Sequence, residues 1–561
     1  GKTVRQNIRI RYLAPLALAV LAVMSAACAS SKTASTTTAG GSQAESGDSK
    51  AATDANGKGG TLRVAMTAGN IPIPDQFLTE GGEGKRFVGS NVYDTLLEGN
   101  VWQGDTVPVP GPGLATSWSR SADNLTWTFK LRPGVKFHDG TAFNADSVVF
   151  TFDRVMKKDS EFYSASQAAA GSSNFQQIAS YKKVDDMTFE IVTKKPWSFL
   201  IYDMVSMNIV SPAAVKQWGN KDYPQHASGT GAFKIAKYVD GQVMELVPFA
   251  DYWGDVKPKL DKLVLFPMPE PAARLAALQA GQVDWAEVTP PDSIEQLKAA
   301  GYNVLLKQYP HAIYYGVNVA RAPFDNVKVR QAIAYGIDRS GMVSILSGAA
   351  KPATNLMYEG NAWRDTSFPG YTFDQAKAKS LLAEAGVKLP IKMTLAYPTG
   401  GSGNMWPGPM DEKFQQDMKA IGIDVTLVPL EWNTIMSLNR AGLYAKDYEQ
   451  YDAFFFSPNT QAPLGAFGSF LSERIPKNGG CCNGTGYSSK EFDNAIAEAA
   501  KEFDAAKQAV ILQKADQVLT AEVPIIPVVH DLNLRVLSPK VRGWVQPQSW
   551  WGDFRSVWVK S

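Results

Sequence analysis

The chain has 561 residues, which is too long for a single hydrophobic core and predicts two or three domains. Hydrophobic residues make up 45% of the sequence and charged residues 20%, as is ordinary for a globular protein. The formal net charge is +2, but residues 1–28 hold four basic residues and no acidic one, so the remainder carries a net charge of −2. This balance gives no support to nucleic-acid binding.

Residues 1–28 have the pattern of a secretory signal peptide. A basic start precedes an apolar run from Leu13 to Met24, which is too short to span a bilayer as a stable helix, and small residues then lead to Cys28. The segment resembles a bacterial lipoprotein signal, in which the cysteine becomes the lipidated N-terminus, although Ser25 stands where such signals usually have leucine. We expect lipidation of Cys28, with ordinary cleavage after Ala27 as the alternative.

Residues 29–60 contain no aromatic and no large aliphatic side chain. Because such a segment cannot bury a core, it is predicted to be a flexible linker. Behind a lipidated cysteine it would tether the folded part to a membrane surface. The alternative is a disordered tail that follows a cleaved leader.

Folded structure is expected from the strand at residues 61–66, where apolar residues alternate with period two. Further along, Gly229-Thr230-Gly231 suits a tight backbone turn in which side chains would clash. A hairpin then follows, with strands around 233–238 and 243–247 and the turn signal Asp240-Gly241 between them.

Strands and helices alternate through the rest of the chain, which indicates an α/β fold. The predicted helices have caps or glycine stops at their ends and lie at 144–154, 271–280, 327–337 and 374–386. The further predicted strands lie at 262–266, 315–318, 393–396, 423–427, 451–456 and 524–529.

Several strings carry a resemblance to a known family. They are GTGAF with the later ADYWGDVKP (229–258), LRPGVKFHDGTAFNADSVVFTFDRV (131–155), APFDNVKVRQAIAYGIDR (322–339) and RVLSPKVRGW (535–544). Together they resemble the signatures of family-5 extracellular solute-binding proteins, the peptide-type receptors of bacterial ABC importers. The resemblance covers nearly all of residues 61–545.

The resemblance implies an α/β, periplasmic-binding-protein-like fold with two lobes (type II, cluster C) and an extra inserted domain. The expected large lobe comprises residues 61–98, 229–313 and 525–561. The inserted domain is expected at 99–228 and the second lobe at 314–524.

The function implied is that of a binding lipoprotein of an ABC importer. It would capture a peptide or related solute between its lobes by hinge closure and deliver it to the permease and its ATPase. The protein would be a monomer on the outer face of the plasma membrane, held there by its lipid anchor, and would have no cofactor, metal or enzymatic activity. A solute-binding protein for oligosaccharides or other neutral solutes, and a sensor or scaffold lipoprotein without a transport role, are the alternatives.

The ligand residues implied by the resemblance lie in loops beside the cleft. In peptide-binding members an aromatic residue and then an aspartate follow a strand of the second lobe, and the aspartate pairs with the peptide's α-amino group. Counting back from Pro463 places Phe456 at the aromatic position and Asn459 at the acidic one. The full expected set is Gly69, Asn70, Asn355, Trp406, Phe456, Ser457, Asn459 and Thr460.

Asn459 carries no charge, which leaves two interpretations open. Another acid compensates, with Glu80, Glu83 and Asp105 as candidates, or the ligand has no ammonium group at this point. A neutral, hydroxyl-rich ligand would suit Asn459 together with aromatic platforms such as Trp406. That tryptophan has the alternative role of a loop residue packed on the core.

The cysteine and histidine residues suggest few chemical functions other than ligand binding. With Cys28 lipidated, Cys481 and Cys482 are an adjacent pair that would form a vicinal disulfide outside the cell or remain two thiols in a loop. His138-Asp139 has the residue types of a catalytic or metal pair, but a turn is favoured because no third ligand or nucleophile accompanies them.

Enzyme motifs are missing from the sequence. It has no G-x-S-x-G, no H-E-x-x-H and no phosphate-binding loop. Hydrolysis by paired carboxylates leaves no sequence signature, but the full-length resemblance argues against it.

Overall fold

The computed structural model describes residues 57–102 and 104–561. The predicted signal peptide, Cys28 and the linker up to residue 56 lie outside the described residues. The last two residues of the predicted linker, Gly59 and Gly60, are already paired with the folded part. Gly59 donates a backbone hydrogen bond of 2.6 Å to Lys259 and accepts one of 3.1 Å from Val559. Folded structure therefore begins before residue 61, because backbone pairing, which needs no large side chain, holds these glycine-rich residues.

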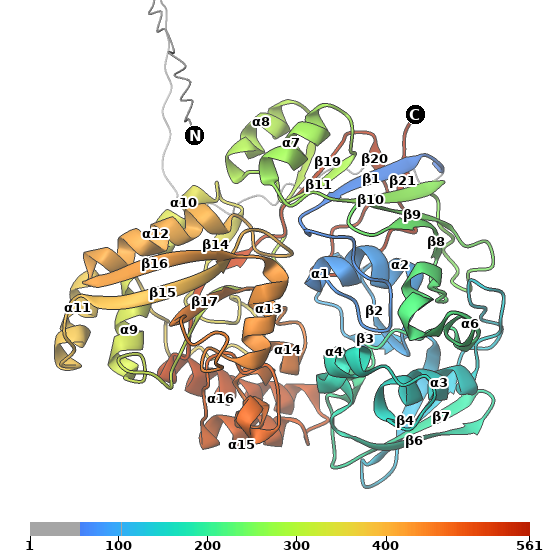
Figure 1. The fold of residues 1–561 in the computed structure, drawn as a ribbon, viewed down its shortest axis with the longest axis horizontal. Coiled ribbons are helices and arrows are strands. Elements are labelled where there is room, and N and C mark those ends of the chain that lie inside the picture. The colour runs from blue at the N-terminus through green and yellow to red at the C-terminus, as the bar shows by residue number, and fades with distance from the viewer. Residues whose placement is uncertain (1–56, 103) are drawn as a thin grey trace, which may run out of the picture. The chain divides into compact units, whose positions relative to one another are not determined.

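The large lobe is built on a seven-stranded sheet in which β1 is central (Figure 1). β1 pairs in parallel with β10 and β11, and the predicted hairpin β8–β9 extends the sheet beyond β10 with antiparallel pairing. In spatial order the strands are β12 (Asn303–Leu305), β19 (Arg535–Leu537), β11 (Trp285–Glu287), β1 (Thr61–Met66), β10 (Lys262–Pro267), β9 (Val243–Pro248) and β8 (Phe233–Val239). The helical segments of this lobe are α1 (Gly81–Glu83), a π-helical turn (Gly84–Gly89), α2 (Ser90–Val92), α7 (Pro271–Gln279), a 3-10 turn (Pro291–Ser293) and α8 (Ile294–Ala299).

The inserted domain contains a four-stranded antiparallel sheet in the order β4, β5, β7, β6. Helix α3 packs against this sheet, and the predicted cap Asn144 forms a capping box with Ser147 at its start. The strands are β4 (Ala115–Arg120), β5 (Thr126–Leu131), β7 (Thr188–Thr193) and β6 (Ile178–Asp185). The helices are α3 (Ala145–Met156), α4 (Ala165–Phe175), α5 (Leu200–Asp203), α6 (Pro212–Asp222) and a 3-10 turn (Tyr223–His226).

The second lobe is built on a six-stranded mixed sheet in which β15 and β16 are parallel (Figure 1). Its strands, in spatial order, are β14 (Ala350–Pro352), β18 (Ile525–Asp531), β13 (Ile313–Val317), β17 (Ala453–Phe456), β15 (Ile391–Pro398) and β16 (Ile423–Leu430). Its α-helices are α9 (Val327–Gly336), α10 (Arg339–Ile345), α11 (Gln375–Glu384), α12 (Pro407–Ala420), α13 (Trp432–Ala441), α14 (Pro463–Phe467), α15 (Lys490–Ala499) and α16 (Ala505–Glu522). Three 3-10 turns lie at Gly468–Phe470, Ser472–Arg474 and Pro476–Asn478. Two short hairpin-like pairs complete the strands: β2 (Leu97–Gly99) with β3 (Pro110–Pro112), and β20 (Val541–Arg542) with β21 (Trp558–Val559).

Strand β18 corrects one expected boundary. We assigned residues from 525 onward to the large lobe, but β18 pairs with β13 and β14 of the second lobe. All seven of its residues are buried, so the strand fits the middle of a covered sheet. The chain returns to the large lobe only after Asp531.

Two segments carry the chain between the two large sheets near this point: residues 306–312, between β12 and β13, and residues 532–534, between β18 and β19. Asp531 ties them together. Its Oδ2 atom accepts a hydrogen bond of 2.8 Å from the Tyr309 hydroxyl and lies 2.6 Å from Nδ1 of His311. The connections between the lobes therefore form one bonded unit.

Candidate ligand-binding site

The loop after β1, which we expected to touch ligand, has its backbone donors occupied. The N–H groups of Thr67 and Ala68 donate hydrogen bonds of 2.9 and 2.8 Å to the two carboxylate oxygens of Glu83. Burial, together with the nearby Glu287 carboxylate, raises the pKa of Glu83 to about 7. The Glu83 carboxylate thus holds the backbone of this loop in place.

The other two candidate acids are also engaged elsewhere. Glu80 accepts a hydrogen bond of 3.1 Å from the side chain of Asn433 on α13, and burial raises its pKa. The exposed Asp105 pairs with Lys307 at 3.0 Å. None of the three acids lines the cavity described next.

A cavity of about 260 Å³ lies where the inserted domain, the second lobe and the C-terminal segment meet. We call it the Asn459 cavity. The inserted domain and the loop before it contribute Pro108, Pro110, Ser173, Asn174, Phe199, Tyr202, Asp203, Val205 and Ser206. The second lobe contributes Asn459, Gln461, Ala462, Leu464, Gly465 and Arg474, and the C-terminal segment contributes Trp551. A solute here would contact three parts of the chain that are far apart in sequence.

Hydrogen bonds between the inserted domain and the second lobe close one side of this region. The Ser198 backbone N–H donates a 2.7 Å bond to the Ala500 carbonyl, and the Gln508 side chain donates a 2.8 Å bond to the Ser198 hydroxyl. The side-chain amide of Gln461 donates a bond of 3.2 Å to the Pro108 carbonyl. The cavity is thus enclosed by contacts between separate parts of the fold.

Asn459 lies at the wall of this cavity. Its Oδ1 atom accepts a 2.9 Å hydrogen bond from the Gln461 N–H, and its backbone pairs with His311 in the connection between the lobes. Among residues 57–102 and 104–561, nothing accepts a hydrogen bond from its Nδ2 group. The side chain therefore offers a donor, where an aspartate would offer only acceptors.

Two charged side chains that the sequence did not single out line the same cavity. Asp203, at the end of α5, accepts a 2.9 Å hydrogen bond from the Trp197 indole, and burial raises its pKa to about 7. Arg474 is 8% exposed, and burial lowers its pKa. Asp203 comes from the inserted domain and Arg474 from a 3-10 turn of the second lobe. Because they are far apart in the sequence, they form no motif that the sequence could reveal.

The other residues that we expected to contact the ligand do not line the Asn459 cavity, and several of them make hydrogen bonds that stabilise the fold. Asn70 accepts hydrogen bonds from the backbone N–H groups of Ile71 and Gly241, at 2.7 and 2.6 Å, and so fastens the β8–β9 turn. Gly69 beside it is exposed. Asn355 is buried and donates a bond of 2.8 Å to Asp516 on α16.

Three expected residues near Asn459 also make contacts within the fold, two by hydrogen bonds and one by ring packing. The Ser457 hydroxyl donates a 2.6 Å bond to Oδ1 of Asn404, and the Thr460 N–H donates a 2.9 Å bond to the Pro310 carbonyl. Phe456 packs against Tyr314 and the indole of Trp432, with ring centroids 5.9 and 5.5 Å apart.

Trp406 precedes α12 and is partly buried against the core of the second lobe. It is not part of the Asn459 cavity wall. Trp406 is therefore a loop residue packed on the core, which was the alternative to its role as an aromatic platform for the ligand.

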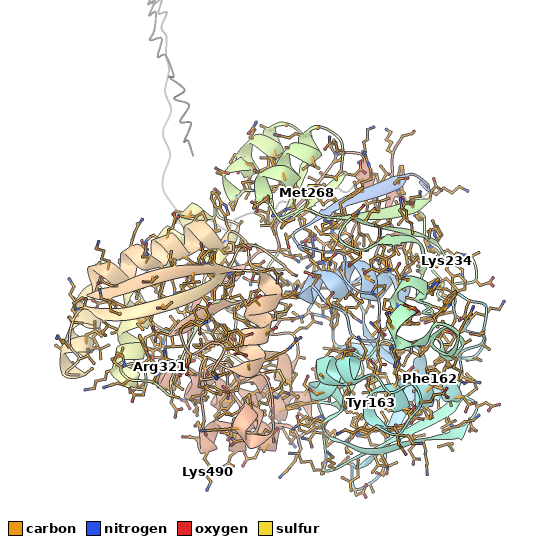
Figure 2. The ribbon with its side chains drawn as sticks, viewed as in Figure 1. Phe162, Tyr163, Lys234, Met268, Arg321 and Lys490 are labelled. Carbon is orange, nitrogen blue, oxygen red and sulfur yellow. A yellow bond between two sulfur atoms is a disulfide. The ribbon has the colours of Figure 1, made fainter. Side chains whose placement is uncertain are left out.

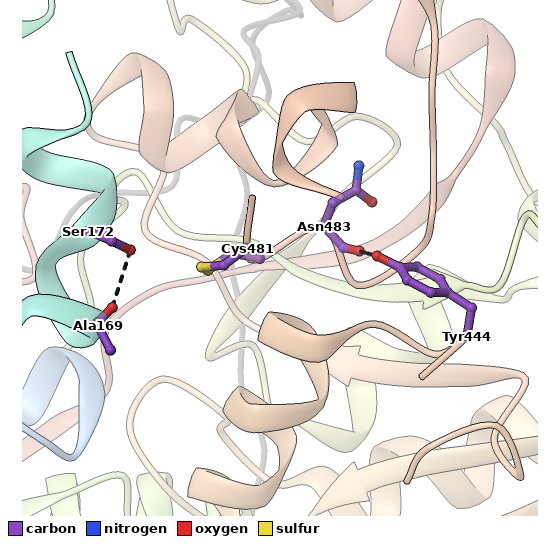
Figure 3. Close-up of a disulfide and its surroundings, with 6 residues drawn as sticks. Ala169, Ser172, Tyr444, Cys481 and Asn483 are labelled. Atoms are coloured by element: carbon purple, nitrogen blue, oxygen red, sulfur yellow. Dashed lines mark hydrogen bonds between the residues drawn. A yellow bond between two sulfur atoms is a disulfide. The ribbon is translucent and has the colours of Figure 1, made fainter. Parts of the chain in front are cut away.

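Cys481 and Cys482 are joined by a disulfide (Figure 3). Cys481 lines a second cavity of about 570 Å³, here called the Cys481 cavity, and faces Ala169 and Ser172 on helix α4. Tyr163, labelled in Figure 2, belongs to the same wall. Ser173 and Arg474 line both cavities, so the two adjoin.

His138 and Asp139 hold a turn in place. Nε2 of His138 lies 2.9 Å from the Gly231 carbonyl, and the Asp139 carboxylate accepts a hydrogen bond from the Ser211 hydroxyl. Burial lowers the pKa of His138 to about 4. Within the part of the chain that the structure describes, no three His, Cys, Asp or Glu side chains are grouped so that they could hold a metal ion. In that part, no helix is both long enough and apolar enough to cross a membrane.

The two-lobe α/β fold, with its short connections between the lobes, is the fold of periplasmic peptide-binding proteins of known structure. Residues 109–474 match the family model described as bacterial extracellular solute-binding proteins, family 5 Middle. The chain belongs to this family, whose members are transport binding proteins and not enzymes. The expected family, fold and lack of enzymatic activity are thereby confirmed.

Individual relatives bind different solutes. The chain is 29% identical to heme-binding protein A of Haemophilus influenzae over 507 residues, covering 83% of this chain and 87% of that protein. It is 28% identical to the glutathione-binding protein GsiB of Shigella boydii over 450 residues, covering 78% and 84%. It is also similar to the solved structure of the periplasmic binding protein DppA of Helicobacter pylori with the peptide STSA, with a TM-score of 0.77 and 25% identity over 90% of this chain and 99% of that one.

Proposed function

We propose that the protein is the substrate-binding component of an ABC importer and captures a short peptide or related solute in the Asn459 cavity. The observation that carries this proposal is the cavity itself, because its wall combines side chains of the inserted domain, the second lobe and the C-terminal segment. A site assembled from separate parts of the fold is complete only when those parts are together. Relatives named for heme and glutathione, and a neighbour solved with a peptide, support a small organic solute.

Hinge closure is the proposed mechanism. The two connections between the lobes are short and meet at Asp531, so they can act as one pivot. Solute contacts on several parts of the wall would favour the closed arrangement, since a ligand shifts a conformational equilibrium by its difference in affinity for the two states. The permease would then receive the closed, loaded form.

Export and anchoring complete the proposal. The leader pattern and Cys28 support a lipoprotein on the outer face of the plasma membrane, with residues 29–56 as its tether. The mass of the N-terminal peptide from the membrane fraction tests this directly. A diacylglycerol adduct on Cys28 is expected, and a free N-terminus at Cys28 or Ala29 would contradict anchoring.

A neutral solute such as an oligosaccharide is the second candidate ligand, and the uncharged Asn459 favours it. Mass spectrometry of the small molecules released by denaturing the purified protein separates the two ligand classes. Peptides support the first proposal, and sugars support the second.

A pair of variants on one helix tests the location of the site. Ser173→Trp places a bulky ring into the cavity wall, whereas Ala170→Trp alters an exposed position of the same helix α4 that belongs to neither wall. Ser173→Trp is expected to abolish the thermal stabilisation given by the released solute, and Ala170→Trp to preserve it. Equal stabilisation of both variants would show that the solute binds elsewhere.

A further inference from the structure

Arg474 differs from the other deeply buried arginines of this protein. Arg154 pairs with Asp75, Arg535 pairs with Glu287, and Arg274 donates hydrogen bonds to four backbone carbonyls. The Arg474 guanidinium makes no hydrogen bond and no ion pair with any of residues 57–102 or 104–561, and its Nε atom is buried without a partner. Its charge is attracted by the carboxylates of Asp203 and Glu473, but neither of them binds it directly. A buried cation whose N–H donors have no acceptor is costly, so this position calls for an explanation.

The position of Arg474 in the fold explains why a buried cation is present here. It is the last residue of the 3-10 turn Ser472–Arg474 and lines both the Asn459 cavity and the Cys481 cavity. The residue is more than nine-tenths buried. Because it belongs to both walls, it lies where the two cavities adjoin. A ligand that reached this junction could accept several of its five N–H donors.

The charges around the junction are predominantly positive. The Cys481 cavity is lined by Lys158 and Lys194 in addition to Arg474, and by no carboxylate. The single acid of the Asn459 cavity, Asp203, attracts the guanidinium but does not lie within ion-pair distance of it. Lys194 donates a 2.8 Å hydrogen bond to the Gln176 carbonyl, which holds its ammonium group near α4.

We propose that Arg474 binds an anionic group of the ligand, and that the protein therefore selects solutes bearing a free carboxylate, anchoring them by this group and not by an ammonium group at position 459. A guanidinium matches a carboxylate in planar, bidentate geometry, which gives both affinity and orientation. Asn459 then needs no charge, because the ligand is fixed from its other end. This inference rests on the proposed capture of short peptides or related solutes in the Asn459 cavity.

Three forms of one peptide distinguish the two anchoring modes. Calorimetry is performed with tri-alanine, with its N-acetylated form, which keeps the carboxylate, and with its C-terminal amide, which keeps only the ammonium group. The acetylated form is expected to bind within about threefold of the free peptide, and the amide at least about tenfold more weakly. Equal binding of all three forms, or loss of binding on acetylation, would overturn the inference while leaving the proposed function intact. Binding of none of them would contradict the proposed peptide capture, and the inference with it.

Variants of Arg474 distinguish a role in ligand binding from a purely structural role. Arg474→Gln is expected to weaken binding of the acetylated peptide by about 10- to 100-fold, and Arg474→Lys by less, because the charge remains. In the absence of ligand, Arg474→Gln should unfold at the same temperature as the parent or higher. It removes a buried charge whose Nε donor has no acceptor, and it loses only a longer-range attraction to Asp203. Arg440→Gln is the matched control, because Arg440 is exposed, in the same lobe and outside both cavities. A marked loss of thermal stability in ligand-free Arg474→Gln, or unchanged affinity, would overturn the proposal.

Discussion

The backbone N–H of Glu83 donates a hydrogen bond of 3.0 Å to the side-chain oxygen of Ser402. Glu83 belongs to the large lobe and Ser402 to the loop after β15 in the second lobe, and both are buried. Asn433 and Glu80 make a second contact of the same kind close by. The lobes are therefore held together by polar bonds as well as by any solute between them.

Ser402→Ala is expected to weaken closure. The variant leaves the buried Glu83 N–H without a partner, which costs about 1–3 kcal/mol in the state where the lobes touch and little where they are apart. Solute affinity should fall by roughly 5- to 100-fold, and the radius of gyration of the ligand-free protein measured by X-ray scattering should increase. Ser340→Ala, at an exposed position of α10, is the control. Unchanged scattering and affinity in Ser402→Ala would show that this bond does not contribute to closure.

Asp203 should make stability depend on pH. Burial raises its pKa to about 7 from an ordinary value of 3.8, so the folded protein binds a proton that the unfolded chain releases between these values. The free energy of unfolding contributed by this group therefore falls as the pH rises from about 4 to about 7, by about 1.4 kcal/mol for each pH unit at most. Asp203→Asn removes the contribution and keeps an acceptor for Trp197.

Urea unfolding of the parent and of Asp203→Asn at several pH values measures this difference. The advantage of the variant should grow between pH 4 and pH 7 and then level off. Asp159→Asn, at an exposed position of the inserted domain, should follow the parent throughout. Parallel curves for the parent and Asp203→Asn would mean that the Asp203 carboxyl group is solvated.

Asn459→Asp should add the acid that peptide-binding relatives are expected to use. The Gln461 N–H can still donate to the new carboxylate, so the loop keeps its bond. Peptides with a free ammonium group should bind about 10- to 100-fold more tightly, because a charge-assisted hydrogen bond replaces a neutral one. N-acetylated peptides should gain nothing, or lose affinity. An equal effect on both forms, measured by calorimetry, would place the ammonium group away from position 459.

Much of the fold follows from local sequence signals, whereas the cavity does not. Asn144 was predicted as a helix cap and is one, because capping depends on residues only a few positions apart. The apolar run that forms β18 was predicted as a strand but assigned to the wrong lobe, because periodicity does not tell which sheet a buried strand joins. Asp203 and Arg474 come together only through the tertiary fold, and neither stands in a pattern that marks it.

Substitution of Gly231 tests the tight backbone turn that the sequence predicts at residues 229–231. A Cβ atom at this position would lie 2.3 Å from the backbone carbonyl oxygen of Asn91, and one at Gly229 would lie 2.1 Å from that of Val92. Backbone atoms cannot yield as a flexible side chain can, so Gly231→Ala should lower the free energy of unfolding by about 1–3 kcal/mol or prevent folding altogether. Gly408→Ala, in the first turn of α12, has open space around it and should be neutral or stabilising by up to about 1 kcal/mol. Thermal unfolding of the two variants compares them directly, and equal stability would mean that the segment at 229–231 moves away from Asn91 at little cost.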